Sequence, residues 1–262
     1  MLLLYALAAV SVPAVAQLEL PSVEFTLHGA YSFGYVDGFV QTPLGGRPGT
    51  SSARRPAFDE LGIHDGGVYD AGLDARWAHL GFYGGYQSIE LDGRGQLASP
   101  LVTHGISFGT GDSISARTRF DWFRVGGGWA FEFAGGQLEL FPKADVAVLD
   151  FDYRLSDASQ STSRSYAKGS VRLGLEVSWQ LNHALSLKLD GAASAPISNT
   201  PQIATVSALL NWRLLPRSHW FHPALFFGGG AEWIDYQDNQ SLPNHVRLDL
   251  GPFVTGGLAF TF

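Results

Sequence analysis

Apolar and polar residues alternate along most of this chain, and this period of two constrains the fold more than any other feature. In the last stretch, every second position from Val246 to Phe262 is apolar except Pro252 and Gly256. The same pattern runs through VEFTLHGAYSFGY (23–35), DSISARTRFDW (112–122) and VRLGLEVSW (171–179). Successive side chains of a strand point to opposite faces, so the alternation predicts strands with one apolar and one polar face.

Composition agrees with an all-β chain and excludes several kinds of function. The 262 residues include 32 Gly, 13% aromatic residues and one Met, which is typical of extended segments separated by turns. The net charge is -7 with no basic tract, so we expect no nucleic-acid partner. The absence of Cys excludes disulfides, thiolate metal sites and a cysteine nucleophile. No phosphate-binding glycine loop or zinc-ligand spacing occurs, and we expect no cofactor and no metal.

The N-terminus has the pattern of a secretory signal peptide. A short apolar run is followed by Ala14-Val15-Ala16 and then Gln17, a small-x-small cleavage pattern. The run is too short to span a bilayer as a helix. The prediction is a signal peptide at 1–16, which carries the chain through the inner membrane, and a mature domain at 17–262.

Short and long connections alternate between the predicted strands. We place about ten strands, with eight to twelve compatible with the pattern: 23–36, 69–77, 82–92, 112–132, 138–155, 165–180, 185–195, 203–214, 222–236 and 244–262. The longest connection covers residues 37–68. Short turns at one end and long loops at the other are typical of an outer-membrane barrel. The sequence therefore predicts a single up-and-down antiparallel transmembrane β-barrel.

The positions of the aromatic residues favour a membrane barrel over a soluble periplasmic β-protein, which stays as an alternative. Two rings are predicted on the apolar face with aliphatic residues between them, as at the two interfaces of a membrane. The ring near the long loops has Tyr31, Phe33, Tyr35, Tyr69, Phe151, Tyr153, Tyr166, Trp233 and Tyr236. The ring near the short turns has Trp77, Trp122, Trp129, Phe131, Phe133, Trp179, Trp212, Phe260 and Phe262.

The last strand, alternating and ending in Phe260-Thr261-Phe262, resembles the C-terminal signature of Gram-negative outer-membrane β-barrel proteins. This resemblance implies a location in the outer membrane, contact with its lipid and lipopolysaccharide, and recognition of Phe260 and Phe262 by the barrel-assembly machinery. It names a class of protein and no activity.

The polar face predicts a charged lumen. About ten strands leave a narrow interior, where charges must be paired or hydrated. Turn positions set Arg124 near Asp145, Lys143 near Glu176, and Glu232 near Arg247 or Asp249. The predicted lumen charge network is Arg76, Arg117, Arg119, Asp121, Arg124, Lys143, Asp145, Arg172, Glu176, Lys188, Asp190, Arg213, Glu232, Arg247 and Asp249. A network of this kind either fills the lumen as a structural plug or lines a small selective pore.

The loop from Thr42 to Ile63 is the most distinctive connection. Pro56 can begin a short helix, with Phe58, Leu61 and Ile63 as its apolar edge. We interpret the loop as a lid over the barrel mouth, a docking element for a surface partner, or a mobile loop. Arg54 and Arg55 are candidates to bind lipopolysaccharide phosphates.

Catalysis is the third hypothesis, because the omptin proteases and lipid A deacylases are also outer-membrane barrels. Omptins use an Asp pair and an Asp-His pair at the extracellular rim. The candidates at the rim of this chain for an omptin-like site are His64, Asp65, Asp70, Asp235, Asp238 and His245, and the candidate for a deacylase is His104. The sequence around them matches no motif of either enzyme family, so no catalytic residue is assigned. Asp235, Asp238 and Asn239 lack the spacing of a strong calcium loop. The preferred reading is a structural or surface-interaction protein with a largely plugged lumen; the alternative is a small-solute or ion channel gated by 42–63.

Overall fold

Ten long antiparallel strands form one closed barrel in the described part of the chain. The computed structural model describes residues 22–41, 55–103, 105–215, 221–240 and 243–262, so the predicted signal peptide lies outside the described residues. The barrel strands are β1 (Val23–Gln41), β2 (Asp65–Trp77), β3 (Leu80–Gln96), β6 (Ser113–Trp129), β8 (Leu138–Ser156), β9 (Ser161–Gln180), β10 (Leu185–Ser194), β11 (Gln202–Arg213), β12 (His222–Gln237) and β13 (His245–Thr261).

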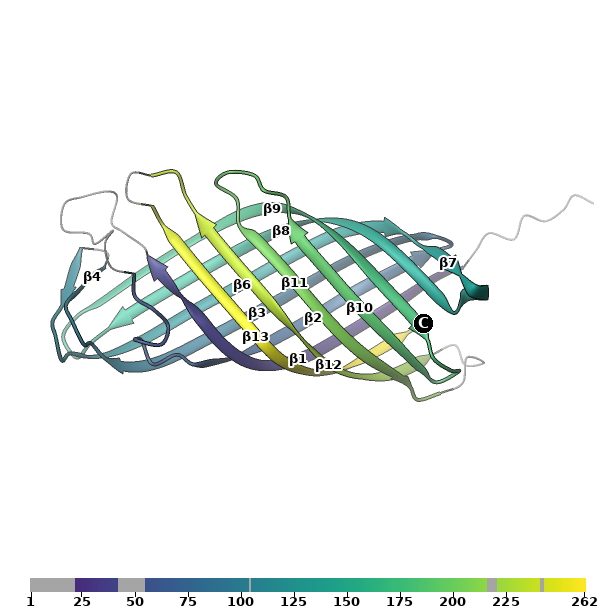
Figure 1. Ribbon diagram of the computed structural model, residues 1–262, viewed down its shortest axis with the longest axis horizontal. Coiled ribbons are helices and arrows are strands. Elements are labelled where there is room, and N and C mark those ends of the chain that lie inside the picture. Colours follow the sequence, from purple (N-terminus) through teal and green to yellow (C-terminus); the bar gives the residue numbers. More distant parts are fainter. Residues whose placement is uncertain (1–21, 42–54, 104, 216–220, 241–242) are drawn as a thin grey trace, which may run out of the picture.

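Each barrel strand pairs with its neighbours in the sequence, and β13 pairs with β1 to close the ring (Figure 1). The short strand β7 (Phe131–Phe133) and the 3-10 turn η1 (Ala134–Gly136) connect β6 to β8, while β4 (Leu101–Thr103) and β5 (Ile106–Phe108) form a separate hairpin in the β3–β6 loop. Within the described residues, no helix is long and apolar enough to cross a membrane. The predicted all-β, up-and-down antiparallel barrel of about ten strands is confirmed.

Several strands are much longer than a membrane crossing requires. A barrel strand crosses the hydrocarbon core with about 9–11 residues, whereas β1 and β8 have 19 residues and β9 has 20. β10 and β11 have 10 and 12 residues and stop short of the others in Figure 1. We call the half nearest the short turns the lower tier and the half nearest the long loops the upper tier, divided at the level of Trp122 and Glu232.

The lower tier has an apolar outer surface. Between the ends of the barrel, Phe82, Phe123, Val125 and Leu173 are exposed on the outside. Around them, the tryptophans Trp77, Trp129, Trp179 and Trp212 are exposed near the short turns, and Tyr31, Phe33, Tyr35, Tyr69 and Trp233 are exposed nearer the long loops. An apolar band between two sets of amphipathic rings is the surface that a membrane-spanning barrel shows to lipid.

The upper tier has the opposite polarity, and β6 shows the change within one strand. Arg117 and Arg119 are exposed, while their neighbours Ala116 and Phe120 are 1% and 0% exposed. Four residues further along, Phe123 takes the exposed face and Arg124 faces the interior. The strand continues without a break, so only the chemistry of the two faces is exchanged.

This exchange corrects part of the predicted lumen network and part of the predicted rings. The charged residues that lie on the outer wall of the upper tier instead of in the lumen are Arg117, Arg119, Asp121, Arg247 and Asp249. The aromatic residues that lie inside the barrel instead of on its surface are Trp122, Phe151, Tyr153, Tyr166 and Tyr236. The predictions assumed one environment for each face along a whole strand. The upper tier needs the reverse, because its inner face packs on loops.

A β-bulge in β13 exchanges the faces of the last strand. The register changes from Gly34 opposite Phe253 to Val36 opposite Leu250, so β13 has one more residue than β1 between these pairs. Gly251 has a φ of 142°, a conformation that side chains other than glycine rarely adopt. Val254 and Leu258 are therefore exposed, whereas Val246, Leu248 and Leu250 are buried inside. The predicted single lipid face along this strand is wrong above the bulge.

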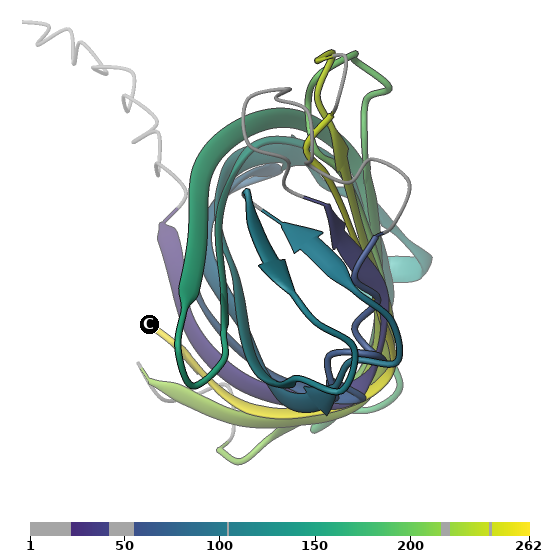
Figure 2. The ribbon, with the colours of Figure 1, turned by 90° about the vertical axis from the view of Figure 1, so that its left-hand side faces the viewer.

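The interior of the upper tier is filled by a cluster of buried apolar residues that we call the apolar plug. The walls of the barrel contribute Phe120, Trp122, Phe151 and Leu248, among others. The loops contribute Phe58, Leu61, Ile63, Leu97, Leu101 and Phe108, all at most 2% exposed. Figure 2 looks onto the long-loop end and shows the β4–β5 hairpin inside the ring of strands. The interior of the upper tier is thus a close-packed apolar core, like the core of a water-soluble protein.

Candidate functional site: the lumen cavity and the apolar plug

The lower tier encloses a polar cavity of about 920 Å³. Its lining reaches the short-turn end at Ala78, Gln137 and Ala184, and ends toward the upper tier at Val68, Gln87, Glu232 and Leu250. The apolar plug lies between this upper limit and the long loops. Eight Asp and Glu and six Lys and Arg side chains line the cavity, so charges of both signs face it.

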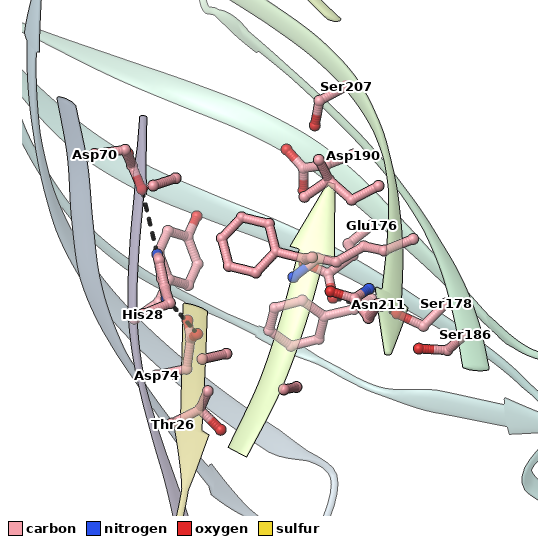
Figure 3. A pocket seen from close by; sticks show the side chains of 18 of the residues that line it. Thr26, His28, Asp70, Asp74, Glu176, Ser178, Ser186, Asp190, Ser207 and Asn211 are labelled. Carbon is pink, nitrogen blue, oxygen red and sulfur yellow. Dashed lines mark hydrogen bonds and ion pairs between the residues drawn. The ribbon is translucent and has the colours of Figure 1, made fainter. Parts of the chain in front are cut away.

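His28 lies between two carboxylates on one wall of the cavity, as Figure 3 shows. Its Nε2 is 3.4 Å from Asp70 Oδ1, and its Nδ1 is 3.4 Å from Asp74 Oδ2. Asp70 also accepts a hydrogen bond of 3.0 Å from Arg124 on β6. This chain of contacts joins β1, β2 and β6 on the inner face, and it gives each carboxylate a partner that burial requires.

A second network joins β8, β9 and β10. Lys143 Nζ donates to Asp190 and lies 3.8 Å from Glu176 Oε2, and Lys188 Nζ is 2.8 Å from the same Glu176 oxygen. Figure 3 shows Glu176 and Asp190 on a different wall from His28. The predicted proximity of Lys143 and Glu176 is confirmed, because β8 and β9 pair in the register that the turns indicated.

The most buried ion pair lies just below the plug. Arg172 donates from Nε and from one terminal nitrogen to the two oxygens of Asp145, at 2.8 and 2.9 Å, and the two side chains are 4% and 2% exposed. The Tyr83 hydroxyl donates to Asp145 at 2.9 Å. Trp122 at the base of the plug stacks over Arg172 and Arg124, at 4.5 and 5.0 Å from the ring centroid. The pair therefore joins the polar cavity to the apolar plug.

Three further sets of contacts cross or close the cavity. Gln87 on β3 donates to Glu232 on β12 at 2.6 Å, across the lumen near its upper limit. Arg76 lies 3.2 Å from Glu139 and 3.9 Å from the Phe141 ring centroid. Arg213 donates to the His183 carbonyl at the short-turn end. Arg124 lies opposite Ala147, two residues from Asp145, so the predicted proximity holds, although its ion pair is with Asp70. The predicted proximity of Glu232 to Arg247 or Asp249 is wrong, because the bulge moves these two residues to the outer face.

Of the predicted network, the cavity brings together Arg76, Arg124, Lys143, Asp145, Arg172, Glu176, Lys188, Asp190, Arg213 and Glu232. Sequence reasoning missed His28, Asp74, Tyr83, Gln87 and Glu139. A signal for Asp74 was present, because it shares a strand face with Arg76 two residues later. Gln87 had no such signal, since its contact across the lumen depends on the closed shape of the barrel. Tyr83 had none either, because it reaches Asp145 past Gly126 on the strand between them.

The first long loop is anchored where the structure describes it. Phe58 N donates to Gly38 O at 3.0 Å, and Val40 N donates to Pro56 O at 3.0 Å. Residues 58–62 form turns in place of the predicted short helix. Phe58, Leu61 and Ile63 are buried in the plug, while Arg55 is exposed with its guanidinium 4.7 Å from the Phe39 ring centroid. Arg54 lies outside the described residues.

The rim residues considered for catalysis do not converge within the described part of the chain. His64 lies 3.2 Å from Asp59, and Asp70 lies in the lumen beside His28. His245 and Asp235 form a pair at 2.9 Å between neighbouring strands. The Asp238 carboxylate accepts the backbone and side-chain N–H groups of Asn244. His104 lies outside the described residues.

The described residues contain no group of three or more His, Asp or Glu side chains placed to hold a metal ion.

No protein-family model matches the chain. A comparison with curated protein sequences gives no match either. Solved structures with a similar fold include the outer membrane protease OmpT from Escherichia coli, with a TM-score of 0.47 and 9% identity over 90% of this chain and 97% of that one. A major outer membrane protein from Thermus thermophilus has a TM-score of 0.43 and 13% identity over 92% of this chain and 100% of that one.

The attachment invasion locus protein Ail of Yersinia pestis, solved with a heparin analogue, has a TM-score of 0.36 and 10% identity over 90% of this chain and 99% of that one. These similarities concern the fold alone. The closed barrel with its apolar outer band is the fold of outer-membrane β-barrel proteins.

Proposed function

We propose that this protein is an integral outer-membrane β-barrel with a closed lumen, whose upper tier serves as a surface for contacts with other molecules at the cell surface. The observation that carries the proposal is the apolar plug, in which six loop residues and the inner walls of the upper tier are packed together. An interior packed with apolar side chains excludes water and ions. The protein acts through its surface and its shape, without conducting solutes.

The proposed orientation follows from the two surfaces. The apolar band of the lower tier lies in the membrane, and the charged outer wall of the upper tier stands in water beyond it. Short turns face the periplasm in barrels of this class, so the start of β1 and the end of β13 lie there. Phe260 and Phe262 in the final strand are the proposed signal for the assembly machinery. The long loops and upper tier then face the cell exterior.

Lipopolysaccharide is the proposed lateral partner. Arg117, Arg119 and Arg247 stand on the outer wall of the upper tier, above the apolar band, where lipid head groups lie. Guanidinium groups bind phosphates with two parallel hydrogen bonds. The double variant Arg117→Ser/Arg119→Ser should retain at most half of the lipopolysaccharide that co-purifies with the wild type. Arg213→Ser, at the short-turn end, should retain all of it, and an equal loss in both variants would contradict this partner.

A channel gated by the first long loop is the second candidate. It is favoured by the burial of Phe58, Leu61 and Ile63 in the plug, which places part of the loop inside the mouth. The two candidates differ in what remains when the loop is removed. If the lumen is closed as proposed, Phe120, Trp122 and Phe151 on the walls of the barrel still block it after the loop is removed.

Single-channel current across a planar bilayer tests both candidates. The refolded wild type should show no current, and a deletion of residues 42–63 should also show none. Current in the deletion alone would establish the loop as a gate. Current in the wild type would refute the closed lumen. Refolding of each sample is checked by its heat-modifiable migration on a gel, so that silence is not a failure to fold.

A further inference from the structure

We propose that the upper part of β9, from Ser161 to Gly169, binds an extended acidic segment of another protein, which adds to the sheet as one more strand. The proposal rests on the proposed function and deepens it, because it gives the upper tier a site and a kind of partner. β9 pairs with β8 from Ser161 to Trp179, but β10 pairs with it only from Arg172 onward. Above the β10–β11 hairpin, β9 therefore has no neighbouring strand on this side among the described residues (Figure 1).

This free edge of β9 presents a row of backbone hydrogen-bonding groups. The Val171 carbonyl accepts a hydrogen bond of 2.8 Å from Ala195 N, just past the end of β10. In an antiparallel sheet, the backbone groups of every second residue point to the same neighbour. The residues that point to the free side are therefore Ser161, Ser163, Ser165, Ala167 and Gly169. A row of unpaired N–H and C=O groups is a template for an added strand.

The free edge is open and stands in water. The side chains of these five residues are exposed on the outer face. The exposed outer-face residues opposite them on β8 are charged: Asp150, Asp152 and Arg154. Residues 161–169 contain no proline and pair with β8 without a change of register, so neither of these features keeps an incoming strand away.

Two cations on the inner face of the edge determine which partner fits. Arg164 and Lys168 are half-buried, and neither forms an ion pair with a described residue. Between them, the Tyr166 ring lies 5.2 Å from the Tyr236 ring on β12, which separates the edge from the apolar plug. Residues directly opposite each other on paired strands have side chains in contact, and opposite charges there stabilise the pairing. The partner that fits has carboxylates opposite Arg164 and Lys168 and a small residue opposite Tyr166.

A second copy of this chain does not fit the edge within one membrane. Two barrels in the same membrane are related by an axis along the membrane normal, and barrel strands tilt by about 35–45° from that direction. The two copies of β9 would tilt in opposite senses and cross at roughly 80°. Strands that cross at this angle cannot form a ladder of hydrogen bonds, so the occupant is a segment of a different protein.

Binding of a synthetic peptide to the refolded mature protein in lipid nanodiscs, measured by fluorescence anisotropy, tests the proposal. The probe has about nine residues, as the free edge does, with glutamates to face Arg164 and Lys168, alanine to face Tyr166 and threonine at the other positions. It should bind saturably. A probe with lysines in place of the glutamates should bind at least tenfold more weakly. A probe with N-methylated amides on the side that faces β9 should be weakened as much.

Two variants of the protein remove the two features of the edge separately. Ser165→Pro deletes one N–H group of the free edge, a position where a strand tolerates proline because β8 does not use that group. Arg164→Gln/Lys168→Gln removes the two charges. Each should weaken binding of the glutamate probe at least tenfold. Arg154→Gln, on the outer face of β8, is the matched control for the charge change and should bind the probe as the wild type does.

Absence of saturable binding by the folded wild type would overturn the proposal, as would equal binding by Arg164→Gln/Lys168→Gln and Arg154→Gln. A wild-type dimer that Ser165→Pro dissociates would assign the edge to a second copy and would also overturn it. Heat-modifiable migration on a gel shows that each sample is folded. Lipopolysaccharide retention and the bilayer current test the proposed function without this edge, so the two failures are distinguishable.

Discussion

The two tiers of this barrel are built from the same strands but are opposite in polarity. The lower tier is apolar outside and charged inside, and the upper tier is charged outside and apolar inside. Each tier turns its apolar face to the apolar neighbour available, lipid in one case and packed loops in the other. The comparison teaches that the environment of a strand face is a local property, even within one uninterrupted strand such as β6.

The largest expected effect comes from breaking the buried ion pair of the lower tier. Asp145→Ala leaves the Arg172 guanidinium buried without its partner, and removal of one member of a buried pair costs about 3–5 kcal/mol. Urea unfolding of the protein in lipid vesicles would measure the loss. A loss below about 1 kcal/mol would mean that water hydrates this pair and that the lower lumen is wetter than the 2% exposure of Asp145 indicates.

The second effect tests the plug. Leu61 comes from the loop and is 0% exposed, so Leu61→Ala should reduce the free energy of unfolding by about 2–5 kcal/mol through lost burial and the cavity left behind. The same unfolding measurement applies. Leu258→Ala, on the lipid side of β13, is the control with the same chemical change, and it should cost less because lipid fills the space. Equal losses would indicate that the loop does not share the core.

The third effect locates the boundary between the tiers on one strand. Leu173 and Ala167 both lie on the outer face of β9, in the lower and upper tier respectively. Leu173→Arg should cost about 2–4 kcal/mol, the cost of a cation within the bilayer. Ala167→Arg should change stability by less than about 0.5 kcal/mol, since it adds a charge to a surface in water. Similar costs at both sites would move the boundary above Ala167.

The smallest effect is expected on the outer wall of the upper tier. Asp92 and Arg117 form a pair at 2.9 Å with both side chains about three-fifths exposed. Exposed pairs contribute about 0–1 kcal/mol, so Asp92→Ala should hardly change unfolding in urea, and added salt should remove any difference. A loss as large as that of Asp145→Ala would show that this wall is covered, for instance by a lipid head group or a second molecule.

Much of the fold was predictable from local pattern, and the candidate site only in part. Strand positions, pairing order and the Lys143–Glu176 contact follow from alternation and turn length, which act between sequence neighbours. Gln87 finds its partner across the lumen, and Tyr83 finds its partner two strands away, which the local pattern does not connect. The change of polarity in β6 was visible, because apolar residues move from even to odd positions between Trp122 and Phe123 without a turn.

The sequence by itself determined that this chain forms about ten antiparallel strands in a closed barrel, because a period of two and the turn signals are properties of neighbouring residues. Only the tertiary structure decided which face of each strand meets lipid, water or protein. The loops that fill the upper tier and the bulge at Gly251 set that choice, and both act between residues far apart in the chain. Whether a side chain is buried depends on what packs against it, and the sequence of a single strand does not contain this information.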